Sequence, residues 1–277
     1  MTTILALAAA VLLTVDVEPR QLTPGTPMRV IVRGVDARSK VSGDFLGHPV
    51  QFLSGPNPAE RIAFAGADLL TKPGVHLLTV RVERAGVEPL SRRVEVRVDP
   101  KDYPTERLKV AKEYVEPPPR VQKRIAREAK MLKAIWASAT PDRLFDGTVN
   151  RPLPGVKGRN FGRRRIFNGR PRSPHSGIDL SAPTGTVVEA AVRGRVVVAE
   201  ELYFSGNLVV LDHGGGVYTL YAHLSRIDVV AGEEVASGAP VGRVGATGRV
   251  TGAHLHWGAR IGWARVDPSS LLDLLSF

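Results

Sequence analysis

Most of this chain consists of short apolar runs with a period of two, separated by glycine and proline. Met28, Val30 and Val32, for example, alternate with polar or basic neighbours. Because alternate residues of a strand point to the same face, this period predicts half-buried β-strands. Proline–glycine pairs fall between the runs at the spacing of turns. Residues 17–99 are therefore predicted to form a small β-sandwich-like domain.

The pattern changes from Arg151 onward, where the apolar runs become rich in β-branched residues and are bounded by glycine. The runs at 195–199, 208–211 and 217–221 have the length of strands, and no helix of ten residues fits between them. An antiparallel, glycine-rich β domain is therefore predicted for residues 146–277. The fold class expected for the whole chain is all-β with one linker helix.

A basic linker is predicted between the two domains, over residues 100–145. Pro117-Pro118-Pro119 forbids helix before Arg120, and a helix can begin there. One face of that helix is apolar, and we expect it to pack on a neighbouring domain. The residues of that face are Val121, Ile125, Leu132 and Trp136.

The charge of the chain is concentrated in this linker. Residues 101–145 hold 11 basic and 6 acidic residues, which gives +5 of the net +11. The opposite, basic face of the helix is predicted to be solvated or to contact an anionic wall or membrane surface. A nucleic-acid partner is not expected, because the chain has no recognisable DNA or RNA module and only 6% aromatic residues for base stacking.

The first residues resemble an export signal. Residues 4–13 form an apolar run with the length of a signal-peptide core, too short to span a bilayer. We therefore expect residues 1–16 to be a signal peptide or apolar leader and the protein to be exported to the periplasm or cell envelope. The preceding residues contain no lysine or arginine, and a buried first strand is the alternative.

Cysteine is absent, so a metal can be held only by histidine and carboxylate groups. Five such groups gather in the C-terminal domain: His175, Asp179, His223, His254 and His256. On a strand, His254 and His256 project to one face, and residues four apart, such as His175 and Asp179, also share a face. A catalytic zinc takes three protein ligands and one water. The set therefore predicts a metal site with two imidazoles left for proton transfer, which favours hydrolysis.

Two stretches carry a family resemblance. FGRRRIFNGRPRSPHSGIDLSAPTGTVV, and the later segment that runs from GNLVVLDHGGG to GAHLHWG, resemble the lysostaphin and LytM-type zinc metallopeptidases. The resemblance covers about residues 155–268. It implies a C-terminal domain of the LytM or duplicated-hybrid-motif type, with Zn²⁺ as cofactor and the peptide cross-links of bacterial peptidoglycan as substrate.

The same resemblance assigns roles to individual residues. It implies that His175, Asp179 and His256 are the metal ligands and that His223 and His254 are catalytic residues that do not bind the metal. Arg164, the arginine of the FGxR pattern, is the candidate for binding substrate. The alternative function is a catalytically silent adaptor that regulates cell-wall amidases. Which cross-link is cut stays open, between a direct D-alanyl to diamino-acid bond and a glycine bridge.

Overall fold

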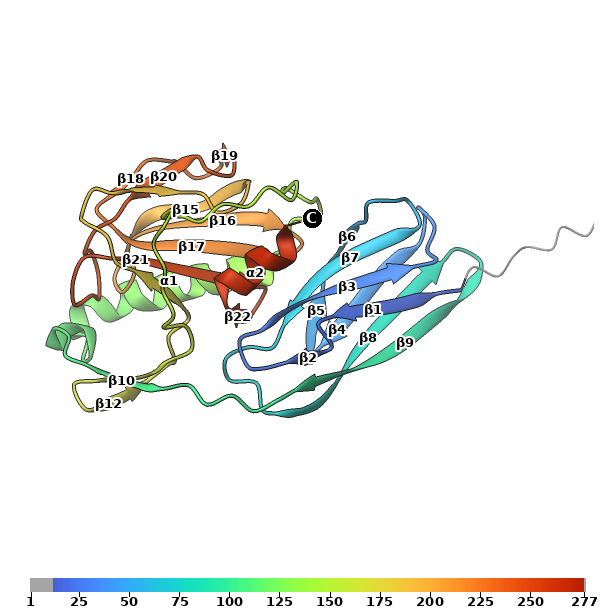
Figure 1. Cartoon of the computed structure of the whole chain (residues 1–277), viewed down its shortest axis with the longest axis horizontal. Helices are drawn as coiled ribbons and strands as arrows, with labels where there is room; N and C mark the ends of the chain where they lie inside the picture. The colour runs from blue at the N-terminus through green and yellow to red at the C-terminus, as the bar shows by residue number, and fades with distance from the viewer. Residues whose placement is uncertain (1–11, 277) are drawn as a thin grey trace, which may run out of the picture.

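The computed structural model describes residues 12–276 and shows two β units with a linker helix against one of them (Figure 1). Most of the predicted leader, residues 1–11, lies outside the described residues. Strand β1 begins at Thr14, within the predicted leader of residues 1–16, and pairs with β3. No helix among the described residues has the length and apolar character needed to cross a bilayer.

The N-terminal unit is a sandwich of two sheets, and the predicted fold class is confirmed. The first sheet has the order β1 (Thr14–Glu18), β3 (Pro27–Arg33), β7 (Glu60–Gly66) and β6 (Phe52–Ser54). The second has the order β2 (Gln21–Leu22), β9 (Val87–Val98), β8 (Gly74–Arg84), β4 (Lys40–Phe45) and β5 (His48–Val50). Alternate residues of both sheets, such as Val30 and Val80, meet in one buried core.

The C-terminal unit is built on one large antiparallel sheet. Its order is β13 (Gly177–Leu180), β21 (Leu255–Ile261), β17 (Val217–Leu224), β16 (Gly206–Gly214), β15 (Gly194–Leu202) and β19 (Glu234–Val235), and β22 (Ala264–Val266) also pairs with β21. A small sheet contains β14 (Val187–Glu189), β20 (Pro240–Arg243) and β18 (Arg226–Ile227). Helix α2 (Pro268–Leu275) follows β22, and Asp267 caps its first turn.

The predicted linker helix is present as α1 (Pro119–Ala137). It begins one residue earlier than expected, because a proline is tolerated in the first turn, where its missing N–H has no helical partner. Leu132 and Trp136 of the predicted apolar face pack against buried residues of β15, β16 and β17. The Tyr218 hydroxyl holds the end of the helix by donating to the carbonyl of Ser138 at 2.7 Å.

The rest of the linker contains structure that the sequence did not predict. Strand β10 (Thr105–Leu108) pairs in parallel with β11 (Arg164–Phe167), which in turn pairs with β12 (Arg170–Arg172). A short 3-10 helix, η1 (Lys112–Tyr114), comes between β10 and α1. Two parts of the linker therefore contact the C-terminal unit: β10 pairs with β11, and α1 packs against the large sheet.

The two β units share a buried apolar cluster, and polar and aromatic contacts around β22 add to it. Asp68 of the sandwich accepts two hydrogen bonds from the Arg265 guanidinium, at 2.6 and 2.8 Å, and both side chains are largely buried. It also accepts the backbone N–H of Arg265 at 3.0 Å. His48 stacks on Trp263 with ring centroids 4.0 Å apart. These contacts fix the sandwich to the end of the large sheet.

Candidate active site

Strands β13 and β21 bring the central residues of the site together. They pair in antiparallel register, with Asp179 opposite His256 and Ile178 opposite Trp257. Because side chains alternate along a strand, Asp179 and His256 share one face, and the buried Ile178 and Trp257 share the other. The neighbouring strand β17 ends at the site and places Ala222 beside His256.

Three donor atoms converge on this face. His175 Nε2 lies 2.9 Å from Asp179 Oδ1 and 2.9 Å from His256 Nδ1, and the last two atoms are 2.8 Å apart. The backbone carbonyl of Asn160 is 2.8 Å from His175 Nδ1 and can only accept, so Nδ1 carries the proton and Nε2 has a lone pair. That lone pair faces a carboxylate oxygen, an arrangement that needs a cation between them.

The residues fit a zinc ion. Two imidazole nitrogens and one carboxylate oxygen form a ligand set of catalytic zinc sites. At bond lengths of about 2.0–2.2 Å, tetrahedral ligands lie roughly 3.4 Å apart, so the observed triangle would open by only about half an ångström. His175, Asp179 and His256 are also the three residues found as a candidate metal cluster among the described residues.

The Asp179 carboxylate is held by residues behind it. Its second oxygen, Oδ2, accepts hydrogen bonds from Asn160 Nδ2 at 3.0 Å and from Arg165 Nη2 at 2.9 Å. The Asp179 backbone N–H donates to Asn160 Oδ1 at 2.9 Å. Such partners fix the orientation of a metal ligand, here leaving Oδ1 to face the two histidines. Sequence reasoning did not identify Asn160 or Arg165.

Electrostatics keep His175 and Asp179 in the protonation states that metal binding requires. Burial lowers the pKa of His175 to about 4, so this imidazole is neutral at pH 7. Burial raises the pKa of Asp179, but contacts with His175 and His256 outweigh that effect and hold the pKa well below its usual range. Neutral imidazole and ionised carboxylate are the forms that bind a metal.

His223 and His254 lie beside the cluster. Their Nδ1 atoms are 2.9 Å from the carbonyl of Thr247 and 2.8 Å from the carbonyl of Gly252, so in each neutral ring Nδ1 is the donor. The Nε2 atoms are therefore available to accept a proton, and that of His254 is 3.6 Å from Asp179 Oδ1. The two rings are 5.1 Å apart between centroids.

The backbone at His223 is in the left-handed region, with φ of +65°. Its N–H donates to the carbonyl of Ser205 at 2.9 Å, which helps to hold this unfavourable conformation. Burial lowers the pKa of the imidazole to about 3, with further lowering by His256 and His254. His223 is therefore a neutral imidazole in a fixed position.

Arg164 lies apart from the cluster. Its guanidinium pairs with Asp102 at 2.6 Å and its side chain is 61% exposed. Along β11 the next residue points to the opposite face, so Arg165 is the arginine that reaches Asp179. Arg164 therefore pairs away from the cluster, and its role in binding substrate stays a prediction.

A cavity of about 370 Å³ lies beside the cluster and is lined by residues between 165 and 265, His223 and His256 among them. Arg249 lines it with its guanidinium 4.9 Å from the ring centroid of Phe167 and 4.8 Å from that of Phe204. No carboxylate of residues 12–276 forms an ion pair with Arg249, and burial lowers its pKa to about 10, so it stays charged. The wall of the cavity is therefore positive.

The chain is similar to known proteins over the part that carries this site. The model of Peptidase family M23 matches residues 173–268. A structure solved as a candidate M23 peptidase from Pseudomonas aeruginosa is 30% identical, with a TM-score of 0.68, over 90% of this chain and 94% of that one. The stretch matched by the family model contains all five residues of the site, from His175 to His256. The chain belongs to peptidase family M23, which confirms the family resemblance found in the sequence.

Two curated relatives are more similar over a shorter stretch. The peptidoglycan DD-endopeptidase ShyA of Vibrio cholerae is 43% identical over 99 residues. The DD-carboxypeptidase/endopeptidase Mpg of Neisseria meningitidis is 45% identical over 97 residues. Each stretch is 35% of this chain but only 23% and 22% of the respective relative. The chain thus matches less than a quarter of the length of these relatives.

Proposed function

We propose that this protein is a zinc-dependent endopeptidase that hydrolyses the peptide cross-links of bacterial peptidoglycan. The observation that carries the proposal is the triangle of donor atoms from His175, Asp179 and His256, with edges of 2.8–2.9 Å. Two further imidazoles, those of His223 and His254, lie beside it. The names of the relatives ShyA and Mpg support peptidoglycan as the substrate. Because that polymer lies outside the cytoplasm, we also propose that the protein acts in the periplasm or cell envelope.

His175, Asp179 and His256 would hold the zinc ion. When bound, zinc lowers the pKa of a water ligand to about 7 and polarises a carbonyl. One of His223 and His254 takes the proton of the attacking water on its Nε2 atom. The other hydrogen-bonds the developing oxyanion or gives a proton to the leaving amine. Arg165 and Asn160 keep the Asp179 carboxylate in place throughout.

Zinc analysis combined with digestion of purified peptidoglycan tests this function. We expect one zinc per chain, new amino termini in the digest, loss of both after chelation, and recovery of both on adding zinc. The measurements are elemental analysis and mass spectrometry of the released muropeptides. A protein without metal that releases no amino termini would instead be the adaptor that regulates cell-wall amidases.

The positive wall of the cavity supports a substrate with a free carboxylate near the bond that is cut. Arg249 and its neighbour Arg172 have no acidic partner among residues 12–276, and Arg172 donates to the carbonyl of Val115. A guanidinium pairs with a carboxylate through directed hydrogen bonds. A direct D-alanyl to diamino-acid cross-link carries such carboxylates, whereas a glycine bridge has none along its length. We therefore propose the direct cross-link as the substrate.

Replacing Arg249 with methionine should lower kcat/KM by about 10- to 100-fold on the direct cross-link, mainly through KM. A charged hydrogen bond is worth about 1.5–3 kcal/mol, and the methionine keeps the apolar contact with the two phenyl rings. The assay compares a cross-linked peptide that has free carboxylates with its amidated form. Arg249→Lys should recover part of the loss, and Arg195→Met, at an exposed arginine paired with Glu234, should change nothing. Equal losses on both peptides would contradict a carboxylate-binding role.

A further inference from the structure

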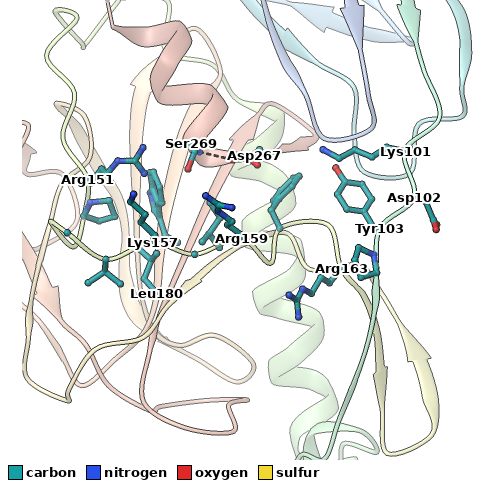
Figure 2. Close-up of a pocket in the computed structure, with 18 residues that line it drawn as sticks. Lys101, Asp102, Tyr103, Arg151, Lys157, Arg159, Arg163, Leu180, Asp267 and Ser269 are labelled. Atoms are coloured by element: carbon teal, nitrogen blue, oxygen red, sulfur yellow. Dashed lines mark hydrogen bonds between the residues drawn. The ribbon is translucent and has the colours of Figure 1, made fainter.

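A second cavity, of about 640 Å³, lies between the start of the linker, the loop 151–163 and the first turn of α2 (Figure 2). Ile178, Leu180 and Trp257 line it. These residues alternate with Asp179 and His256 along β13 and β21, so the cavity is on the opposite side of the strand pair from the metal cluster. It is a separate site, and nothing in the proposed reaction uses it.

Basic side chains surround this cavity. They are Lys101, Arg151, Lys157, Arg159 and Arg163, against the two acidic residues Asp102 and Asp267, which leaves a formal charge of 5 − 2 = +3. Both acids already have partners, since Asp102 pairs with Arg164 and Asp267 caps α2. Arg163 pairs with Glu106 at 3.5 Å. No carboxylate of residues 12–276 lies within ion-pair distance of Arg151, Lys157 or Arg159, so these three are the cations without an acidic partner. A cluster of cations without acidic partners favours an anionic ligand.

The floor of the cavity is apolar. Phe161, Ile178, Leu180 and Trp257 line it, and all four are buried. The first backbone N–H groups of α2 are not available, because Ser269 and Ser270 donate theirs to Asp267. The ligand that suits this cavity therefore combines carboxylates with aliphatic groups.

We propose that this cavity, the basic pocket, is a second and non-catalytic binding site for an uncross-linked stem peptide of peptidoglycan. The proposal rests on the proposed function. Stem peptides combine carboxylates, alkyl groups and amide carbonyls, and the volume is that of a site for a small organic ligand. A phosphate polymer would satisfy the cations but would make no apolar contact with the floor. A peptide held there would keep the enzyme on the wall while the opposite face cuts.

The loop that forms one wall of the basic pocket also supports the metal ligands. Arg159 and Phe161 line the pocket, while Asn160 between them bonds to His175 and Asp179. Gly158 packs so tightly that an added Cβ would lie 2.6 Å from the carbonyl oxygen of Asp179. Ligand binding should therefore be visible as slower amide exchange over residues 151–163.

The test compares the variant Arg151→Ala/Lys157→Ala with the matched control Lys123→Ala/Arg127→Ala, which removes two exposed cations from α1. The probes are a synthetic stem peptide with free carboxylates, its fully amidated form, and a glycerol-phosphate polymer. With the zinc-loaded full chain, we expect the pocket variant to bind the free peptide at least about 10-fold more weakly than the wild type or the control. Loop 151–163 should be protected from exchange in the wild type and the control only. The amidated peptide should bind weakly to every form.

Three outcomes would overturn the proposal. The pocket variant could bind the free peptide as tightly as the wild type, the loop could remain unprotected in the wild type, or the phosphate polymer could bind more tightly than the peptide. Cleavage of a short soluble cross-linked peptide is measured separately and should be the same in all three proteins. If none of them cleaves it, the proposed hydrolase function fails, while the binding and exchange data still decide the basic pocket.

Discussion

Replacing His256 with alanine should remove both the zinc and the activity, whereas replacing His254 should leave zinc in place and lower kcat by about 100- to 10,000-fold. The difference follows from position. His256 Nδ1 is one of three atoms that face each other at 2.8–2.9 Å, while the nearest approach of His254 to that group is 3.6 Å. Zinc per chain and kcat on a soluble cross-linked peptide are the two measurements.

His76→Ala serves as the control for these variants. That histidine lies on β8 of the sandwich, and its ring Nε2 is 2.9 Å from the carbonyl of Lys72. Its replacement should change neither zinc content nor kcat. If the variants at 254 and 256 both kept full zinc and full activity, the assignment of ligand and proton carrier would be wrong.

Replacing Asp68 with asparagine should lower the free energy of unfolding by about 3–5 kcal/mol, because the Arg265 guanidinium would lose its buried counter-charge. The two side chains are only 6% and 16% exposed and are joined by two hydrogen bonds. Burial raises the pKa of Asp68, but bonds from Arg265 outweigh burial and lower it. The contribution of the pair is therefore complete above a pH of about 4 and declines as the pH falls further.

Chemical denaturation at pH 7 measures this loss, and Asp102→Asn is the matched control. The Asp102–Arg164 pair has a similar length of 2.6 Å but is exposed, so its removal should cost less than about 1 kcal/mol. Changing both partners to apolar residues, Asp68→Leu with Arg265→Met, should recover most of the stability. A loss in Asp68→Asn no larger than that in Asp102→Asn would show that the docking contact contributes little.

The regular parts of this molecule could be predicted from local patterns. A period of two identified the strands, a helical period identified α1 after its proline run, and the same alternation put His254 and His256 together. These features depend on near neighbours in the sequence. The convergence of His175 with His256, 81 residues apart, followed from the family resemblance and depends on the pairing of β13 with β21.

The residues that support the site could not be predicted in this way. Arg164 and Arg165 are identical side chains one position apart, and only the start of β11 decides which one faces Asp179. Asn160 lies in a loop, where no period applies. Arg249 lies among glycines that indicate turns. Its position in the cavity wall depends on contacts with Phe167 and Phe204, which come from other segments of the chain. In each case the position of the side chain depends on contacts with residues that are distant in the sequence.

The pairing of β10 with β11 affects how this protein can be divided. Glu106 on β10 approaches both Arg163 and Arg165, each at 3.5 Å, and Arg165 in turn bonds to Asp179. A fragment that starts at residue 146, the predicted domain boundary, would lose the Glu106 carboxylate and expose one edge of β11. A fragment meant to keep the support of Asp179 should therefore start before Thr105.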